Sequence, residues 1–311
     1  MKQLPSLPET LVCKFCDRPR IHKCIANGLS KLYVTTKKGA KHKLLKTLME
    51  YHDSYDLRAL SVRQIYELVA EVKLLYPNLE AHNYRRLCAQ LAPLFSYKSA
   101  VEWLKKNNLI LPLYSGLRYC PYCNADPVYA TRIKEQSVRS DLDHFFPKEK
   151  FPFLAVTLHN LVPACSRCNR LLKSDQAEEL LKIAMPYRDD FDNNVHFDIL
   201  IENIGDCFSS VQRDRCHVVS FPNRNKCVGE RAMALTRFFG LEEVYDRIFF
   251  EDIGDLLRRV QIYFSNYPAF LKLKGVDVAQ MIWHDIPAKG DIDKCQLGKL
   301  KRDILHQFGI I

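Results

Sequence analysis

Long apolar runs are missing from this sequence of 311 residues. No stretch approaches the roughly 18 consecutive apolar residues that a membrane-spanning helix needs, so we expect no membrane partner. The first eight residues contain two prolines and lack the apolar core of a secretory signal. Internal repeats and low-complexity segments are also missing. With 47% hydrophobic and 26% charged residues, the composition is typical of a globular protein, which we expect to be cytoplasmic.

Acidic residues are scarce at the start of the chain. Residues 1–50 carry 11 Lys and Arg against 3 Asp and Glu, whereas residues 176–311 carry 18 against 21. A polyanion such as DNA would therefore meet the N-terminal half first. The densest positive segment, here called the lysine run, contains Lys37, Lys38, Lys41 and Lys43. We expect it to contact nucleic acid, but a solvated loop is an equally open interpretation.

Two Cys-x-x-Cys pairs lie 41 residues apart, Cys120 with Cys123 and Cys165 with Cys168. This spacing lets each pair present two thiolates to one metal ion, and four thiolates make a closed, structural Zn²⁺ site. The gap exceeds the roughly 15–20 residues of a compact zinc ribbon, so we expect further structure between the pairs. None of the ten histidines begins the His-x-Glu motif that zinc deaminases need. Two buried pairs without metal remain the alternative.

The segment between the cysteine pairs holds polar residues suited to a second kind of metal chemistry. Asp143 and His144 end an expected strand that must stop before Pro147. Because neighbouring strand residues face opposite sides, this pair converges on one substrate only at a strand end. A second expected strand, 158–163, carries His159 and Asn160. An expected short helix then carries three cations on one face: Arg167, Arg170 and Lys173.

These motifs together resemble the HNH, or ββα-metal, nuclease family, over about a fifth of the chain. The resemblance implies that Asp143 and Asn169 are metal ligands, that His144 is the general base and that Asn160 braces the loop. The step from Asn160 to Asn169 is similar to that of the HNH domain of the RNA-guided CRISPR nuclease. The Cys-x-x-Cys-Asn sequence at the helix start is similar to that of the phage Holliday-junction resolvases, which also have four zinc cysteines.

The implied activity is metal-dependent hydrolysis of phosphodiester bonds in DNA, with RNA not excluded. A neutral imidazole suits His144 to take a proton from water. Oxygen ligands from Asp143 and Asn169 would suit Mg²⁺ or Mn²⁺. The competing interpretation is a non-catalytic zinc-stabilised module that binds nucleic acid or a protein partner.

Several individual assignments stay open at this point. Asn124 and Asn169 each follow a cysteine pair, where a zinc knuckle favours a left-handed residue, so Asn169 has a purely structural alternative. His159 lies next to Asn160 and faces the other way, which favours a structural role. Arg167 and the other two cations of the expected helix either contact phosphates or form a solvated face.

The rest of the chain is expected to be helical. We divide it into a basic, cysteine-rich and irregular segment (1–40), a helical region (41–110), the HNH module (115–175) and a helical C-terminal region (176–311). Helices are expected after the capping box that begins at Ser61, over 99–107, over 228–262 and over 296–309, and a strand over 109–114. The overall class is α+β: mainly helical with a small inserted ββα zinc module.

Two further features carry weaker expectations. A second Zn²⁺ site would be formed by Cys13, Cys16, His22 and Cys24. Cys207, Cys216, His217 and Cys227 are too scattered to assign. Residues 235–263 loosely resemble the helical segment of bacterial anti-phage nucleases that work beside an ATPase, which implies an ATPase partner.

Overall fold

The computed structural model describes residues 3–134, 136–173, 180–201, 216–222, 226–265, 281–288 and 290–311. These residues are mainly helical and also form small two-stranded antiparallel sheets. The expected α+β class is therefore confirmed. In this part of the chain no helix has the length and apolarity to cross a bilayer.

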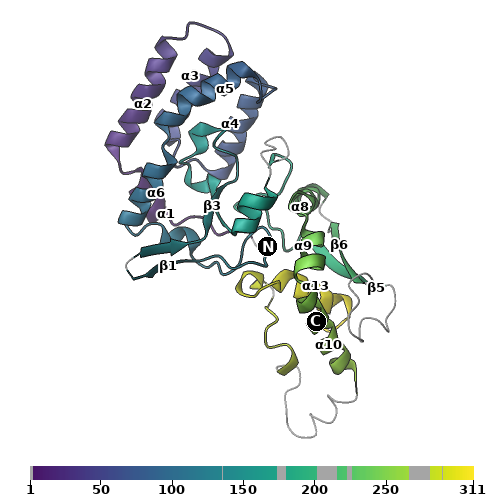
Figure 1. Ribbon diagram of the computed structural model, residues 1–311. Helices are drawn as coiled ribbons and strands as arrows, with labels where there is room; N and C mark the ends of the chain where they lie inside the picture. The colour runs from purple at the N-terminus through teal and green to yellow at the C-terminus, as the bar shows by residue number, and fades with distance from the viewer. Residues whose placement is uncertain are drawn as a thin grey trace.

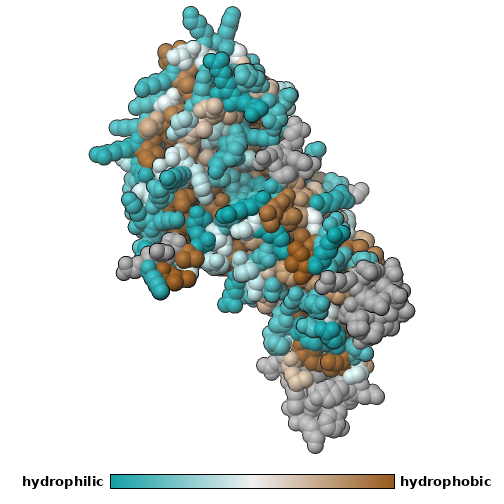
Figure 2. Space-filling model, viewed as in Figure 1, coloured by the Kyte–Doolittle hydropathy of each residue, from teal (hydrophilic) through white to brown (hydrophobic). Residues whose placement is uncertain are grey.

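The N-terminal region is a bundle of helices, seen in purple and blue in Figure 1. Its helices are α1 (Glu9–Cys16), α2 (Pro19–Val34), α3 (Ala40–Tyr55), α4 (Val62–Leu75), α5 (His82–Leu91) and α6 (Tyr97–Lys106). The capping box is present, since the Ser61 side chain accepts from Gln64 N and the Gln64 side chain accepts from Ser61 N. Hydrophilic residues cover much of the visible surface of this bundle (Figure 2).

Residues 1–40 were expected to be irregular, and that expectation is wrong. The helix α1 buries Leu11 and Phe15, and α2 buries Ile25 and Leu29. Each pair is four residues apart and so lies on one helix face. This apolar spacing, interrupted by charged residues, is sufficient for amphipathic helices once a partner surface exists.

The central region connects the helical bundle to the C-terminal region. Its elements are η2 (Leu111–Tyr114), β1 (Ala130–Ile133), β2 (Gln136–Arg139), β3 (Asp141–His144), η3 (Pro152–Leu154), η4 (Leu158–Asn160), β4 (Leu161–Ala164) and η5 (Arg167–Leu172). Strand β1 pairs with β2, and β3 pairs with β4. The strand expected over 109–114 is wrong, because Pro112 sits in the first turn of a 3₁₀ helix that buries Leu113 and Tyr114.

The C-terminal region contains a sheet that the sequence patterns did not indicate. Strands β5 (Val195–Ile201) and β6 (Cys216–Pro222) pair over seven residues. The helical stretch expected over 228–262 consists of three helices: α8 (Lys226–Phe238), α9 (Leu241–Ile248) and α10 (Phe250–Phe264). Gly240 lies between the first two with a φ of 56°, a left-handed conformation that ends a helix. The last helix, α13 (Gly298–Gln307), agrees with the expected terminal helix.

Helical side chains cap both edges of this two-stranded sheet. On β5, Asp303 accepts from Phe197 N at 3.0 Å, and Gln307 bonds both Ile199 N and Ile199 O at 2.9 Å. On β6, two α9 carboxylates accept from Val218 N and Ser220 N, each at 2.7 Å. Four helical residues rise about 6 Å and two strand residues about 6.6 Å, so each helix matches the strand it covers.

The C-terminal region docks directly onto the first cysteine pair. Asn124 has a φ of 53°, which confirms the expected left-handed residue there. Its side chain accepts from Lys299 N and donates to Ile292 O, both at 3.0 Å. Tyr245 donates to the Cys123 carbonyl at 2.9 Å. The C-terminal region is thus anchored to the loop that carries the first cysteine pair.

Candidate metal centre and active-site pocket

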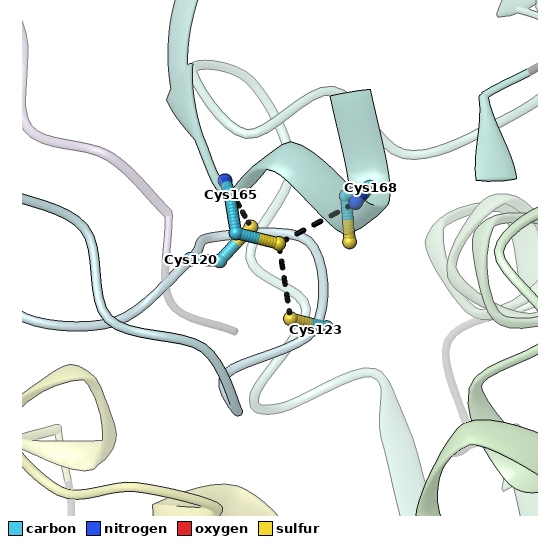
Figure 3. A group of neighbouring side chains, drawn as sticks. All are labelled: Cys120, Cys123, Cys165 and Cys168. Atoms are coloured by element: carbon cyan, nitrogen blue, oxygen red, sulfur yellow. Dashed lines mark hydrogen bonds between the residues drawn. The ribbon is translucent and has the colours of Figure 1, made fainter. Parts of the chain in front are cut away.

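The four cysteines expected to bind Zn²⁺ come together in the structure. Cys120 and Cys123 lie on a loop, Cys165 follows β4 and Cys168 lies on η5 (Figure 3). Their sulfur atoms all lie within 4.8 Å of one another, and all four residues are buried. This cluster could bind a metal ion such as zinc, because four thiolates at such separations match a tetrahedral structural site.

Backbone amides support the sulfur atoms. Cys165 N donates to Cys120 Sγ and Cys168 N to Cys165 Sγ, each at 3.4 Å. Hydrogen bonds from Cys120, Cys165 and Cys168 lower the pKa of Cys123 well below its usual value. Burial raises the pKa of Cys120, and hydrogen bonds with the other three cysteines raise that of Cys168, so Cys123 is the thiolate that its neighbours stabilise.

The N-terminal cysteines are arranged differently. Cys13 and Cys16 lie on α1, while His22 and Cys24 lie on α2. Within the described ranges, the Cys120 cluster brings four ligand atoms together, whereas these N-terminal residues do not form a group of three or more. Of the scattered C-terminal set, Cys207 lies outside the described residues, and the others are absent from any such group.

The hairpin of β3 and β4 positions the expected catalytic pair. Asp143 pairs with Val162 and His144 with Leu161 in an antiparallel register. Strand β3 ends at His144, as expected from Pro147. The second strand begins only at Leu161, because residues 158–160 form the 3₁₀ turn η4. Strand, strand and a short helical turn follow one another in the expected order.

A polar pocket of about 400 Å³ lies at the end of this hairpin. It brings together Asp143, His144 and Asn169, although the last is 25 residues further along the chain. Its lining residues are Tyr97, Arg139, Asp141, Leu142, Asp143, His144, Pro147, Lys148, Glu149, Asn169 and Lys173. A pocket that gathers carboxylates, an imidazole and cations is the arrangement expected of a site for hydrolytic chemistry.

Asp143 is 3% exposed, and both of its carboxylate oxygens accept hydrogen bonds. Lys173 Nζ donates to its two carboxylate oxygens at 2.6 and 2.7 Å and also to the His144 carbonyl. Tyr122 donates to Asp143 Oδ2 at 2.7 Å. A cation therefore occupies the position beside this carboxylate, which shows that the site favours positive charge.

His144 is half-buried, and one hydrogen bond orients its ring. Its Nε2 lies 3.0 Å from the Ala155 carbonyl oxygen. A carbonyl only accepts, so Nε2 carries the proton and Nδ1 keeps the lone pair of the neutral ring. Tyr97 packs edge-on at 4.5 Å between centroids. Burial, and to a lesser degree Lys148 and Lys173, lowers the pKa of His144 to about 4, so the ring is neutral at physiological pH.

Asn160 is fully buried and braces the loop after β3. Its Oδ1 accepts from Phe146 N at 2.8 Å, and its Nδ2 donates to the carbonyls of Phe146 and Leu154 at 3.0 and 3.1 Å. Leu154 directly precedes Ala155, whose carbonyl orients His144. The geometry therefore agrees with a bracing role.

Asn169 lies in the pocket with a partner that the sequence patterns did not indicate. Its Nδ2 donates to Asp141 Oδ2 at 3.2 Å, and Arg170 makes two bonds to the same carboxylate at 2.7 and 2.8 Å. Its backbone is helical, within η5, and it is not among the described residues with positive φ. The left-handed role considered for Asn169 is therefore wrong, and its side chain faces a carboxylate instead.

The cations expected to contact phosphates are held by acidic residues in this structure. Arg170 pairs with Asp141 and Lys173 with Asp143. Arg167 pairs with Asp126 at 2.7 Å and lies over the Phe249 ring. They are therefore not a simple solvated face.

The lysine run and His159 lie outside the pocket. The first two lysines of the run lie in the link between α2 and α3, at the top of Figure 1, and the other two lie in the first turn of α3. Lys37, Lys38 and Lys43 are exposed, while Lys41 donates to Gln90 at 2.9 Å. His159 Nδ1 bonds the Leu60 carbonyl at 2.9 Å, and its ring packs against Tyr187. This packing agrees with a structural histidine.

Three residues that line the pocket, and a fourth that contacts Asp143, were not expected from the sequence. Asp141 shares a strand face with Asp143, and the two-residue step was a usable signal. Tyr122 lies between Cys120 and Cys123, and nothing local in the sequence links its hydroxyl group to Asp143. Tyr97 and Arg139 reach the pocket from α6 and β2, and nothing local in the sequence indicates that.

Part of this chain is similar to a known protein. A stretch of 81 residues is 40% identical to Septu protein PtuB of Bacillus thuringiensis. The match covers 26% of this chain and 29% of that protein, so the chain spans less than a third of the relative's length. No family model and no solved structure matches the chain. The similarity to a Septu protein therefore covers about a quarter of this chain.

Proposed function

We propose that this protein is a metal-dependent HNH endonuclease that hydrolyses phosphodiester bonds of DNA. The observation that carries the proposal is the pocket where β3 ends, which holds Asp143, His144 and Asn169 together. The pairing of a strand-end carboxylate with a neutral imidazole, beside a buried four-cysteine cluster, is what the resemblance to the family implies.

The donor atoms in the pocket fit a divalent cation. Asp141 and Asp143 offer carboxylate oxygens and Asn169 an amide oxygen, the ligands that Mg²⁺ and Mn²⁺ prefer. The ammonium group of Lys173 against both Asp143 oxygens marks a position that favours a cation. Asp143 and Asn169 would hold the ion, which when bound stabilises negative charge on the phosphate. The zinc cluster would remain structural, because four thiolates leave no open position.

The protein's own groups account for the proton transfer. In the proposed reaction, water attacks the phosphorus atom while the bond from phosphorus to the departing sugar oxygen breaks. His144 Nδ1 takes the proton of the attacking water, and the departing oxygen takes a proton from bulk water. The bond from Nε2 to Ala155 O orients the ring and stabilises the imidazolium that forms. Asn160 fixes the loop that carries this carbonyl. Tyr122 holds Asp143 in place from the opposite side.

The biological setting proposed here is bacterial anti-phage defence beside an ATPase partner. Two observations support it: the partial similarity to a Septu protein, and the loose resemblance of residues 235–263 to the helical segment of defence nucleases. One of the helices found there, α9, contacts the cysteine cluster through Tyr245, which donates to the Cys123 carbonyl. This contact would couple a partner on this region to the pocket.

A specific observation favours a second candidate, a non-catalytic zinc-stabilised module that binds DNA or a protein. Lys173 neutralises Asp143, and Arg170 neutralises Asp141. Cations in these positions would by themselves satisfy the carboxylates, with no need for a catalytic ion.

Metal-dependent cleavage distinguishes the two candidates. Supercoiled plasmid, single-stranded DNA and RNA are each incubated with the protein and Mg²⁺, Mn²⁺ or EDTA. The nuclease proposal expects cleavage of DNA that EDTA abolishes and His144→Ala removes, while His284→Ala, at an exposed histidine, cuts normally. Absence of cleavage by folded, zinc-loaded wild-type protein would support the binding module.

A further inference from the structure

Arg139 is a half-buried arginine in the wall of the pocket, and the proposed chemistry does not use it. It ends β2, two residues before Asp141. Its Nη1 donates to the Ser140 carbonyl at 2.9 Å and to the Tyr114 hydroxyl at 3.3 Å. These contacts fix the guanidinium beside the pocket that His144 also lines.

The positive charge of Arg139 has no carboxylate partner among the residues that the structure describes. The acidic residues that line the pocket pair with other cations: Asp141 with Arg170, Asp143 with Lys173 and Glu149 with Lys148. Arg139 Nε is buried and has no hydrogen-bond partner in the described part of the chain. Its hydrogen bonds go to the Ser140 carbonyl and to the hydroxyl groups of Tyr114 and Tyr97, which are neutral oxygens and do not balance a charge.

Several other buried or half-buried arginines of this protein have a carboxylate partner. Arg58 bonds Asp56 with its Nε and Nη2 atoms, and Arg167 bonds Asp126. Arg231 pairs with Asp189 at 2.7 Å. Removing a guanidinium from water costs several kcal/mol unless an anion compensates it. By comparison with these three, the anion that would compensate Arg139 is missing from the chain itself.

We propose that Arg139 binds a backbone phosphate of the nucleic acid strand that enters this pocket. Guanidinium groups recognise phosphate with two parallel hydrogen bonds, and Arg139 retains donors for them. Lys148, which also lines the pocket and lies over the Tyr97 ring, adds positive charge on the same side. The inference rests on the proposed function for its substrate class and assigns the residue that anchors the strand next to His144.

Binding without cleavage tests this assignment. A short fluorescent DNA duplex is titrated in EDTA with His144→Ala protein and with the double variant that adds Arg139→Gln, at several salt concentrations. We expect Arg139→Gln to weaken binding about tenfold, the size of a lost charge-assisted hydrogen bond. The slope of log affinity against log salt should fall by about one, as for one lost phosphate contact.

Arg132 on β1 provides the matched control. It belongs to the same hairpin, is exposed, bonds Asn108 and does not line the pocket. Arg132→Gln removes the same charge and should leave affinity and slope nearly unchanged. Equal losses from both variants, or no loss from Arg139→Gln, would overturn the assignment.

A charge-preserving variant separates binding from folding. Arg139→Lys should keep the salt slope and lose part of the affinity, because it keeps the charge without the planar fork. Where Arg139→Gln lowers the melting temperature, its loss of affinity reports folding as well as binding. The Arg139→Lys protein then decides, and wild-type affinity at every salt concentration would refute the proposal. Absence of cleavage by wild-type protein, with a normal Arg139 effect on binding, would reject the nuclease and leave the phosphate site standing.

Discussion

The side chain of Asn160 provides the sharpest test of how the fold holds the pocket. Asn160→Ala removes three buried hydrogen bonds, one to Phe146 N and two to the carbonyls of Phe146 and Leu154. At about 1 kcal/mol net for each bond, the free energy of unfolding should fall by about 3 kcal/mol. Because Leu154 O loses its donor, the neighbouring Ala155 carbonyl should no longer hold His144 Nε2 in place.

Two measurements on one preparation check this expectation. Urea unfolding gives the change in the free energy of unfolding, and plasmid nicking gives the rate of the folded protein. A misplacement of about 1 Å costs on the order of 100-fold in rate, so we expect a loss of this size in kcat. Zinc content and DNA affinity should stay at the wild-type level, since neither the cysteines nor the pocket cations change.

Asn107→Ala is the matched control for this experiment. Asn107 is exposed and makes a single bond to the Trp103 carbonyl, so its loss should change stability by less than about 0.5 kcal/mol. A folded Asn160→Ala protein that cuts at the wild-type rate would show that the brace serves stability alone. Unchanged stability would refute the hydrogen-bond reasoning itself.

The remaining predictions concern the other parts of the molecule. Cys120→Ser should unfold the central region and abolish zinc binding, and metal analysis that finds no zinc in folded wild-type protein would contradict the site. His144→Ala should lower the cleavage rate by about 10²–10⁴-fold without loss of zinc or melting temperature; raised Mn²⁺ should partly rescue Asp143→Ala but not His144→Ala. Neutralising the lysine run should weaken DNA binding and flatten its salt dependence; an unchanged slope would make the run a solvated loop. Glu242→Ala should destabilise the protein by about 1–3 kcal/mol in urea unfolding, because Ser220 N on the edge of β6 loses its acceptor; Glu242→Gln, which keeps an acceptor oxygen, should cost less.

Local sequence patterns predicted several elements correctly. The capping box at Ser61 depends on residues three positions apart, and the Asp143-His144 strand end depends on Pro147 four residues on. The short spacing within each cysteine pair also predicted a shared site, and the four sulfur atoms lie close together as expected. For the capping box and the strand end, the residues involved lie within about one turn of backbone. For the cysteine pairs, metal-ligand chemistry allows few alternatives.

Tertiary contacts decided what those patterns left open. The segment at 1–40 was expected to be irregular but is helical. Its helices are stabilised mainly by burying Phe15 and Leu29 against other elements, which local sequence patterns do not reveal. The sheet of β5 and β6 was not predicted. Its edges are completed by helical carboxylates that are distant in the sequence: Glu242 lies 22 residues from Ser220, and Asp303 lies 106 residues from Phe197.

The pocket illustrates the same division. The sequence by itself indicated which residues to propose for chemistry, namely Asp143, His144, Asn160 and Asn169, because their types and spacing suit few roles. Only the tertiary structure decided the partners of the pocket residues: Lys173 contacts Asp143, Asp141 contacts Asn169, and Arg139 has no carboxylate partner in the described part of the chain. Hydrogen bonds and ion pairs act over about 3 Å. Residues that are far apart in the sequence come within this distance only after the hairpin, the helical turn and the cysteine cluster have packed together.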